Sequence, residues 1–456
     1  MKNTDSKLKV IKKSKNLDYQ LSKINSIFKS STTKQINPPE LLDISESLKN
    51  ESVTLEIYCN RLQQLVLVET KDSYSIQSQR YCKYDDDADY VFDGLQSEYI
   101  SQYINDINKY MKSLLSLYSE MSELKEESKS KSKYTKDDFK NGIPIEDARY
   151  IIPTAFPCNI VMTIKGDQLI NLIYRIIKEK ELMTFLLHDL INELPGIEII
   201  VNTFLLNLSS LYTNDNQEEL NQDFKMHIDD LSIGGIAALT CTNSEPPSEL
   251  AKRDNLQKVA NNVVAKLNHT SVVEHIDIDI QTSLSLCCYN QLVRHRHQNI
   301  ERTQFSSLIN KWWLDNEDLE KLIVIPETLN PYKEKITIIF NNLHDIISKI
   351  MNNVPLVLEN EVACLLAQLL PMGVRLGLHI NSNLTNELYI CEKRTCLLAH
   401  WEIREFTHKK INCLIDNYGN IPIITKTYPA CLKDGCKEGK GCCGHPEIVK
   451  EIFNNK

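Results

Sequence analysis

The stretch from residue 269 to residue 307 constrains the chain most, because several patterns follow one another in it without a break. Isoleucines at every second position over residues 276–280 alternate with polar residues, as in a strand with one buried face. The segment SLSLCCYNQLV that follows contains no breaker and predicts a helix. At its far end stand Arg294, His295 and Arg296, a cationic cluster suited to phosphates or an anionic ring. A solvated helix end is the alternative for this cluster taken alone.

The spaced residues of this stretch resemble the flavin-dependent thymidylate synthases, the ThyX family. That family carries a His-x-Ser-x-x-Glu-His box, matched here by His269, Ser271, Glu274 and His275. It then carries Gln-x-x-Arg-His-Arg, matched by Gln291, Arg294, His295 and Arg296. Later matches are Pro371, Asn383, Arg394 and the segment AHWEIR from Ala399, with His400 in place of the family's glutamine. Several boxes in the family's order are more specific than any single box.

Length, composition and charge limit the classes of protein that the chain can belong to. Its 456 residues suffice for two or three domains with a large core. The hydrophobic share of 42% is ordinary for a globular protein, and no apolar run reaches membrane-spanning length. A net charge of −9 argues against a general nucleic-acid binder. The 14 scattered cysteines and the lack of a signal-peptide core predict reduced thiols in the cytoplasm.

The first half of the chain resembles the same family, but at different boxes. The family's serine followed by Ser-x-Arg-Tyr is matched by Ser73, Ser78, Arg80 and Tyr81. Ser75 and Ile76 stand where the family has Asn-Glu. The family's Glu-Asp-Ala-Arg-x-x-x-Pro box appears as EDARYIIP, which contains Arg149 and ends at Pro153. Two family-like copies in one chain indicate a diverged tandem duplication.

The two copies have lost complementary boxes. With Ser73 at its family spacing, Val68, Glu69 and Thr70 stand opposite the cationic triplet, a shift of 226 residues. In the second copy CLLAQLLP stands opposite EDARYIIP, so Ala367 replaces Arg149. The family is described as a homotetramer with sites between subunits, so a fused chain needs only one functional face from each copy. We therefore expect composite sites, a homodimer that forms a pseudo-tetramer, and roughly half the usual number of sites.

The resemblance implies an α+β fold in which each copy is a small, mainly antiparallel sheet flanked by helices. We expect a basic disordered tail over residues 1–36, because this segment is rich in lysine and poor in large apolar residues. The copy with the nucleotide-side motifs spans 37–228 and includes a charged loop at 124–142. The copy with the flavin-side motifs spans 229–456 and includes a cysteine-rich tail at 428–446.

The implied activity is the reductive methylation of dUMP to dTMP. Methylene-tetrahydrofolate donates the one-carbon unit, FAD is the cofactor, and NADPH reduces it. The chain would thus be an FAD-dependent methyltransferase of nucleotide biosynthesis that acts on small molecules. A non-catalytic flavin- or nucleotide-binding relative stays open, because Ile76 and Thr385 replace polar family residues. A purely scaffolding protein is a further alternative.

The resemblance also implies a role for each matching residue. The residues expected to bind dUMP are Gln291, Arg294, Ser78, Arg80, Arg149 and Arg394. Those expected to bind the flavin are His269, Ser271, Arg294, His295, Arg296 and Asn383. Arg394 and Ser78 are the catalytic candidates, and Arg394 would favour loss of the pyrimidine N3 proton. A permanently charged guanidinium there stabilises the developing anion.

Structural roles compete with these assignments. Arg394 could pair with Glu387 or Glu392, and Arg149 could form a surface ion pair with Glu146 or Asp147. His269 and Ser78 could be helix or strand caps, and Arg80 an exposed charge. In the tail, Cys431, Cys436, Cys442, Cys443 and His445 would suffice for one tetrahedral zinc. Because they contain no Cys-x-x-Cys pair, we expect no metal but a thiol-bearing tail that packs on the site.

Overall fold

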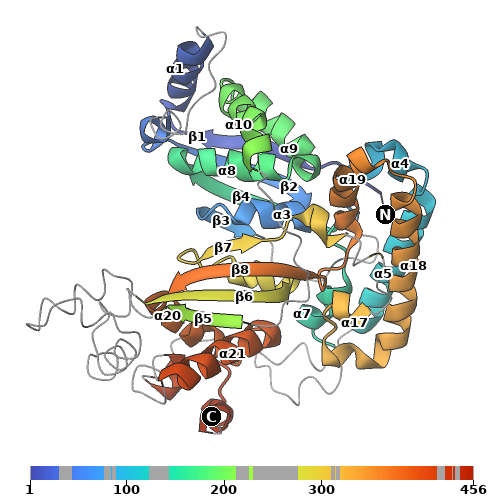
Figure 1. Ribbon diagram of the computed structural model, residues 1–456, viewed down its shortest axis with the longest axis vertical. Helices are drawn as coiled ribbons and strands as arrows, with labels where there is room; N and C mark the ends of the chain where they lie inside the picture. The colour runs from blue at the N-terminus through green and yellow to red at the C-terminus, as the bar shows by residue number, and fades with distance from the viewer. Residues whose placement is uncertain are drawn as a thin grey trace, which may run out of the picture.

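Two antiparallel four-stranded sheets dominate the computed structural model, and helices surround both (Figure 1). The structure describes residues 2–29, 44–76, 84, 89–122, 143–211, 225–229, 276–309, 314, 319–418, 427–433, 435–436 and 442–454. The strands are β1 (Lys7–Lys13), β2 (Ser52–Asn60), β3 (Ser73–Ile76), β4 (Pro157–Lys165), β5 (Lys225–Asp229), β6 (Asp277–Ser285), β7 (Asn299–Arg302) and β8 (Arg375–Asn383). The sheet orders, β1-β2-β4-β3 and β5-β6-β8-β7, are the same. The predicted duplicated α+β fold is confirmed.

The central strand of each copy runs directly into a helix. Strand β2 continues into α3 (Arg61–Val68), and β6 continues into α15 (Leu286–Leu292). Asn60 caps α3 by accepting a hydrogen bond from the Gln63 backbone N–H at 2.9 Å. Ser285 caps α15 in the same way, through the Cys288 backbone N–H at 3.0 Å. These side chains satisfy amide groups that a helix start would leave unpaired, which fixes the turn from strand to helix.

The remaining helices form three groups (Figure 1). Beside the first sheet lie α1 (Leu17–Lys29), α8 (Gly166–Lys178), α9 (Lys180–Glu193) and α10 (Glu198–Leu211); beside the second lie α20 (Leu384–Arg394), α21 (Trp401–Tyr418) and α22 (Pro446–Asn454). The third group contains α4 (Glu98–Ser101), α5 (Ile104–Ser122), α7 (Ile145–Ala148), α17 (Leu319–Leu322), α18 (Lys333–Met351) and α19 (Glu359–Leu366), in which α5 of the first copy packs on α18 of the second. No helix within the described ranges is both long and apolar enough to cross a membrane.

Short 3-10 turns complete the architecture. They are η1 (Asp93–Gln96), η3 (Arg149–Ile151), η4 (Phe305–Leu308), η5 (Glu327–Tyr332), η6 (Leu356–Leu358), η7 (Ala367–Leu369) and η9 (Ala430–Leu432). The turns η3 and η7 occupy corresponding places, just before β4 and β8. They lead into the segments through which the two copies meet.

The copies are joined by backbone hydrogen bonds that repeat in both directions. The Thr154 N–H donates to Leu370 O at 2.9 Å, and the Met372 N–H donates to Ile152 O at 2.8 Å. Thr154 and Met372 are 218 residues apart, as are Ile152 and Leu370, so the two bonds are equivalent. A second equivalent pair links Ala155 to Gln368 and Gly373 to Tyr150, each at 2.8 Å. This exchange is the pattern of an isologous dimer interface, here inside one chain.

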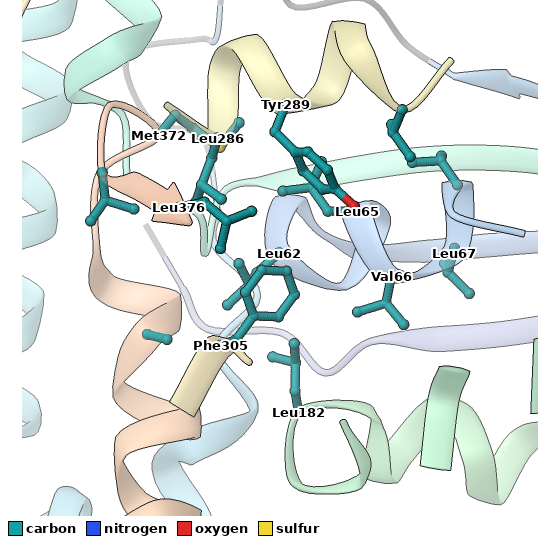
Figure 2. Packing of buried hydrophobic residues seen from close by; sticks show 14 of the residues in the cluster. Leu62, Leu65, Val66, Leu67, Leu182, Leu286, Tyr289, Phe305, Met372 and Leu376 are labelled. Carbon is teal, nitrogen blue, oxygen red and sulfur yellow. The ribbon is translucent and has the colours of Figure 1, made fainter. Parts of the chain in front are cut away.

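One apolar core serves both copies. Figure 2 shows Leu62 and Leu65 of α3 in the same packed region as Leu286 and Tyr289 of α15. Beside them, the Gln64 side chain of α3 donates to the Asn290 side chain of α15 at 3.0 Å. A continuous core of this kind resembles an obligate interface rather than two domains in loose contact.

The element positions refine the alignment of the two copies. Arg61 and Leu286, the first residues of α3 and α15, are 225 residues apart. Ser73 and Asn299, the first residues of β3 and β7, are 226 apart, as the predicted shift requires. The second copy therefore has one extra residue between helix and strand. Under either alignment the first copy lacks the cationic triplet.

The prediction of a disordered tail over residues 1–36 is wrong for its described part. Residues 7–13 form β1, the edge strand that pairs with β2. Leu8 is buried, and its N–H donates to the Asp189 carboxylate of α9 at 2.9 Å; the Val10 N–H donates to Glu193 at 3.1 Å. Carboxylates of α9 thus cover the sheet edge, while the lysines between face outward. The high lysine content concealed this alternation.

Two other segments of the predicted domain organisation are not fully covered by the structure. The charged loop at 124–142 lies outside the described residues. The cysteine-rich tail at 428–446 is described only in part. The boundaries at 37–228 and 229–456 remain predictions.

Gly373 tests the junction between the copies. A Cβ added there would lie 2.6 Å from Val324 O and 3.0 Å from Tyr150 O, both backbone atoms. We expect Gly373→Ala to destabilise the protein by about 1–3 kcal/mol, because this overpacking would push the exchanged backbone bonds apart. Chemical denaturation measures the change. Ser101→Ala, at an exposed position on α4, is the control. Equal stability of the two variants would contradict the account.

Candidate active site between the two copies

The cationic triplet lies in the turn between α15 and β7 and faces the first copy. Helix α15 ends at Leu292 with Val293 as its C-cap, so Arg294 begins the turn. The Arg296 guanidinium lies 5.7 Å from the ring centre of Tyr74 on β3. Burial raises the pKa of Tyr74, and Arg294 and Arg296 oppose that rise. The predicted delivery of the triplet by a helix is therefore confirmed, and its neighbour belongs to the other copy.

His295 is joined to Arg394, the last residue of α20. Arg394 Nε donates to His295 Nε2 at 2.8 Å, and its Nη2 donates to Gln291 O at 3.2 Å. Burial lowers the pKa of His295 to about 3, with Arg394 and Lys410 acting in the same direction. His295 is therefore neutral at physiological pH, and its Nε2 is free of a proton and can accept. The hydrogen bond fixes the place of the Arg394 guanidinium relative to the triplet.

The carboxylates that were considered as partners for Arg394 hold other cations. Glu387 accepts from Lys410 at 2.7 Å, and Glu392 accepts from Lys433 at 2.6 Å. Each of these two carboxylates is thus paired with a lysine.

Arg149 of the first copy lies against the same helix, α15. It is 3% exposed, and its Nε donates to the Glu146 backbone carbonyl at 3.1 Å. Burial raises the pKa of the Cys288 thiol, and both Arg394 and Arg149 oppose the rise, so the charges of both arginines act on Cys288. A surface ion pair, the alternative considered for Arg149, is wrong because the residue is buried. One guanidinium from each copy thus reaches the same region.

Two buried side chains in this region have polar atoms without a partner. Arg149 Nη2 makes no hydrogen bond, and neither Nε2 nor Oε1 of Gln291 makes one. Gln291 lies on α15 and is 6% exposed. A buried unpaired polar atom costs roughly 1–3 kcal/mol, so native proteins rarely keep several together without a purpose. These atoms can donate to, and accept from, a bound polar ligand.

Arg61 is a site candidate that the sequence analysis did not identify. It is the first residue of α3, is 2% exposed, and donates to the Tyr84 hydroxyl at 2.9 Å and to Cys158 Sγ at 3.1 Å. Burial raises the pKa of Cys158, while Arg61 and Arg294 oppose the rise, so Arg294 of the second copy also approaches this thiol. A single charged residue within the segment CNRLQQLVLV was the available signal.

Of the other predicted site residues, four lie outside the described part of the chain and one is a helix cap. Ser78 and Arg80, and likewise His269 and Ser271, lie outside the described residues. Asn383 ends β8 and is the N-cap of α20, because its side chain accepts from the Asn386 N–H at 2.9 Å. Its predicted contact with the flavin remains a prediction.

The cysteine-rich tail docks beside the end of α20. Thr395 Oγ1 donates to Thr427 O at 3.1 Å, and Lys433 pairs with Glu392. This brings the tail next to Arg394. Within the described ranges, no three cysteine, histidine or acidic side chains form a group that could hold a metal.

The position related to the site by the internal pseudo-symmetry contains a buried ion network instead. Glu69 accepts from Arg302 at 2.6 Å, from Arg175 at 2.9 Å and from the Tyr289 hydroxyl at 2.8 Å. Arg302 also donates to Glu179 at 2.6 Å. Burial alone would raise the pKa of Glu69, but Arg302 and Arg175 outweigh it and lower the pKa. At the 226-residue shift Glu69 corresponds to His295, so the same place has acquired opposite chemistry.

The chain is a duplicated α+β protein with arginines of both copies near one another, and comparison with known families identifies its class. The sequence profile of a family described as "Thymidylate synthase complementing protein" matches residues 44–180 and again residues 226–416. These matches span well over half of the chain, and the chain therefore belongs to this family. The resemblance to the ThyX family is confirmed, including its occurrence twice in the chain.

Several relatives and solved structures are similar to the chain. The flavin-dependent thymidylate synthase of Pyrococcus furiosus is 26% identical over 196 residues, which cover 41% of this chain and 78% of the relative. That of Thermococcus kodakarensis is 28% identical over 177 residues, 38% of this chain and 69% of the relative. A crystal structure of the Helicobacter pylori enzyme with FAD and dUMP has a TM-score of 0.31 and 17% identity, covering 43% of this chain and 96% of that chain.

Two buried glutamines provide a test of the unpaired amide. We expect Gln291→Met to raise the stability of the ligand-free protein by about 1–2 kcal/mol, because it removes unpaired polar atoms at similar volume. Gln368 is buried too, but it is fully engaged with Asn60, Asp93 and Leu365. Gln368→Met should therefore lower stability by a similar amount. Chemical denaturation of both variants is the measurement, and a loss of stability in Gln291→Met would show that its amide is paired.

Proposed function

We propose that the chain catalyses the reductive methylation of dUMP to dTMP at a composite site between its two copies. The observation that carries the proposal is that each copy contributes buried, unpaired polar atoms, Arg149 Nη2 and the Gln291 amide, while Arg394 bonds Gln291 O and the charges of both arginines act on Cys288. The relatives named flavin-dependent thymidylate synthase support the reaction type. In this reaction a one-carbon unit from methylene-tetrahydrofolate replaces the C5 proton of dUMP, and reduced FAD supplies the electron pair that makes the methyl group.

The residues present fit an anionic nucleotide. A phosphate requires guanidinium donors, which Arg149 and Arg61 provide from the first copy, with Ser78 and Arg80 as further predicted donors. Gln291 can bind the amide-like edge of a pyrimidine with both its donor and its acceptor. Arg394, held by the neutral His295, can stabilise negative charge on the ring after loss of the N3 proton. Ser78 remains the second catalytic candidate.

The residues around the triplet suit FAD. Arg294 and Arg296 are exposed cations next to Tyr74 and can bind the flavin phosphates or the ring. His295 is bonded to the last residue of α20, Asn383 caps the first turn of the same helix, and His269 and Ser271 complete the predicted set. When bound, FAD supplies the reducing equivalents, and NADPH is the expected reductant.

The position related to the site by the internal pseudo-symmetry, which holds the Glu69 ion network, should not bind a second nucleotide. Glu69 and Glu179 already neutralise Arg302 and Arg175 there, and a phosphate would have to displace two buried carboxylates. We therefore expect about one dUMP per chain by calorimetry. The proposed assembly is a homodimer, equivalent to the family's tetramer. A monomer in light scattering at working concentration would contradict that assembly.

A non-catalytic flavin- or nucleotide-binding relative is the second candidate. Thr385 Oγ1 is buried without a hydrogen-bond partner, and Ile76 is the apolar end of β3. Release of tritium from C5-labelled dUMP, or rescue of a thymidine auxotroph, separates an enzyme from a binder. Purified protein without a flavin absorbance band and without nucleotide binding would leave only the scaffolding alternative. The twelve described cysteines are all free thiols, which suits the expected cytoplasmic location.

The composite site can be tested by mixing variants. Because Arg149 and Arg394 of one chain approach the same thiol, Cys288, we expect the site to form within a single chain. Arg149→Met and Arg394→Met should each reduce activity by about 10²–10³-fold. Co-expression of these two variants should not restore tritium release.

The control for this experiment is the double variant co-expressed with the wild-type chain, which should retain activity from the wild-type sites. Recovery of substantial activity by the two single variants together would mean that sites form between chains. That result would overturn the assignment of both arginines to one chain's site.

A further inference from the structure

A fully buried ion pair lies beneath the cationic triplet. Lys410 of α21 donates to Glu387 Oε2 of α20 at 2.7 Å, and both side chains have 0% exposure. The ammonium also lies 4.5 Å from the ring centre of Phe406. Buried ion pairs are rarely more stabilising than apolar side chains of the same volume, because both charges must leave water. Helix packing alone therefore does not account for this pair.

The second oxygen of Glu387 holds the turn that contains the triplet. Gln298 Nε2 donates to Glu387 Oε1 at 2.5 Å, and Gln298 is 0% exposed. The Gln298 backbone N–H donates to His295 O at 3.3 Å, which closes the turn on itself. From the first copy, Lys71 Nζ donates to Gln298 O at 2.8 Å. Gln298 is therefore a fixed point from which residues 294–297 extend toward the site.

The ionised state of Glu387 matters for this contact. An ionised carboxylate can only accept, and a hydrogen bond to a charged acceptor is stronger than one between neutral groups. Lys410 is the buried cation that neutralises this carboxylate. Without Lys410, the Glu387 carboxylate would lose its buried counter-charge, which is costly in an apolar interior. The chain of contacts thus runs from Lys410 through Glu387 and Gln298 to the triplet.

We propose that Gln298, Glu387 and Lys410 form a positioning triad that sets the geometry of the cationic turn, residues 294–299. The sequence suggested Glu387 only as a partner for Arg394 and did not indicate the other two; all three are positioning residues rather than catalytic ones. It rests on the proposed function only in what the turn is used for, namely binding FAD and dUMP. The fixed turn itself follows from the contacts.

The test compares two double variants that remove both charges. In Glu387→Gln/Lys410→Met the new amide oxygen still accepts from Gln298, whereas in Glu387→Leu/Lys410→Met no acceptor remains. Both replace the ion pair by neutral groups of similar volume, so both should fold. Hydrogen–deuterium exchange, followed by mass spectrometry of peptides covering 294–299, reports on the turn without any ligand. We expect about tenfold faster exchange in the leucine variant and near-wild-type exchange in the glutamine variant.

Equal exchange of the turn in the two variants would overturn the proposal. So would faster exchange spread over all of α20 and α21, which would indicate general loosening. If the leucine variant fails to fold, Gln298→Met tests the same contact and leaves the ion pair intact. The exposed pair Lys335–Glu120, replaced as Lys335→Met/Glu120→Leu, is the matched control and should leave exchange of the turn unchanged.

Flavin binding provides the functional readout. FAD affinity, titrated by absorbance, should fall about tenfold in the leucine variant and recover in the glutamine variant. A wild-type chain that binds no FAD would refute the proposed function, while the exchange experiment would still decide the positioning triad. Unchanged exchange with intact FAD binding would refute the triad alone.

Discussion

The backbone hydrogen bonds exchanged around Pro153 and Pro371 are the constraint on which the remaining structure depends. They bind each copy to the other at equivalent positions, as an isologous interface does between separate subunits. Once they form, α3 and α15 must share one core, and α5 must pack on α18. Side chains from both copies therefore line the region between them, whatever their residue types. Duplication thus fixed the positions of these side chains, while substitutions could change the chemistry of each face independently.

The two faces resolve the problem of buried arginine in different ways. On one face Arg302 and Arg175 are neutralised by Glu69 and Glu179, so the charge balance is completed within the chain. On the other, Arg149 Nε donates to the backbone carbonyl of Glu146, and Nη2 has no partner among the described residues. A bound anion can complete the balance there. Fusion into one chain allows this difference, because in a true homotetramer every copy would carry the same residue at both faces.

Part of this arrangement could be predicted from the sequence, and the reason is local. The alternating isoleucines gave β6, and the breaker-free run gave α15 with the triplet at its end, because these signals lie within a few residues of one another. Strand β1 was missed because its lysines dominate the composition, while its edge position depends on β2 and on carboxylates of α9. Contacts such as Glu69 to Arg302 join residues 233 positions apart, and no spacing rule indicates them.

Buried charge within each copy follows the same logic as charge between the copies. Lys410 and Glu387 place both signs in the interior of the second copy, and this is stable only because each completes the other and Gln298 uses the remaining oxygen. His295 is in contrast kept neutral by burial and by the nearby cations Arg394 and Lys410. A neutral ring can accept from Arg394 where an imidazolium would repel it. The positive charge of the site therefore resides on guanidiniums whose positions are fixed by neutral or acidic partners. Such preorganised charges can stabilise a negatively charged reaction intermediate without the protein having to rearrange.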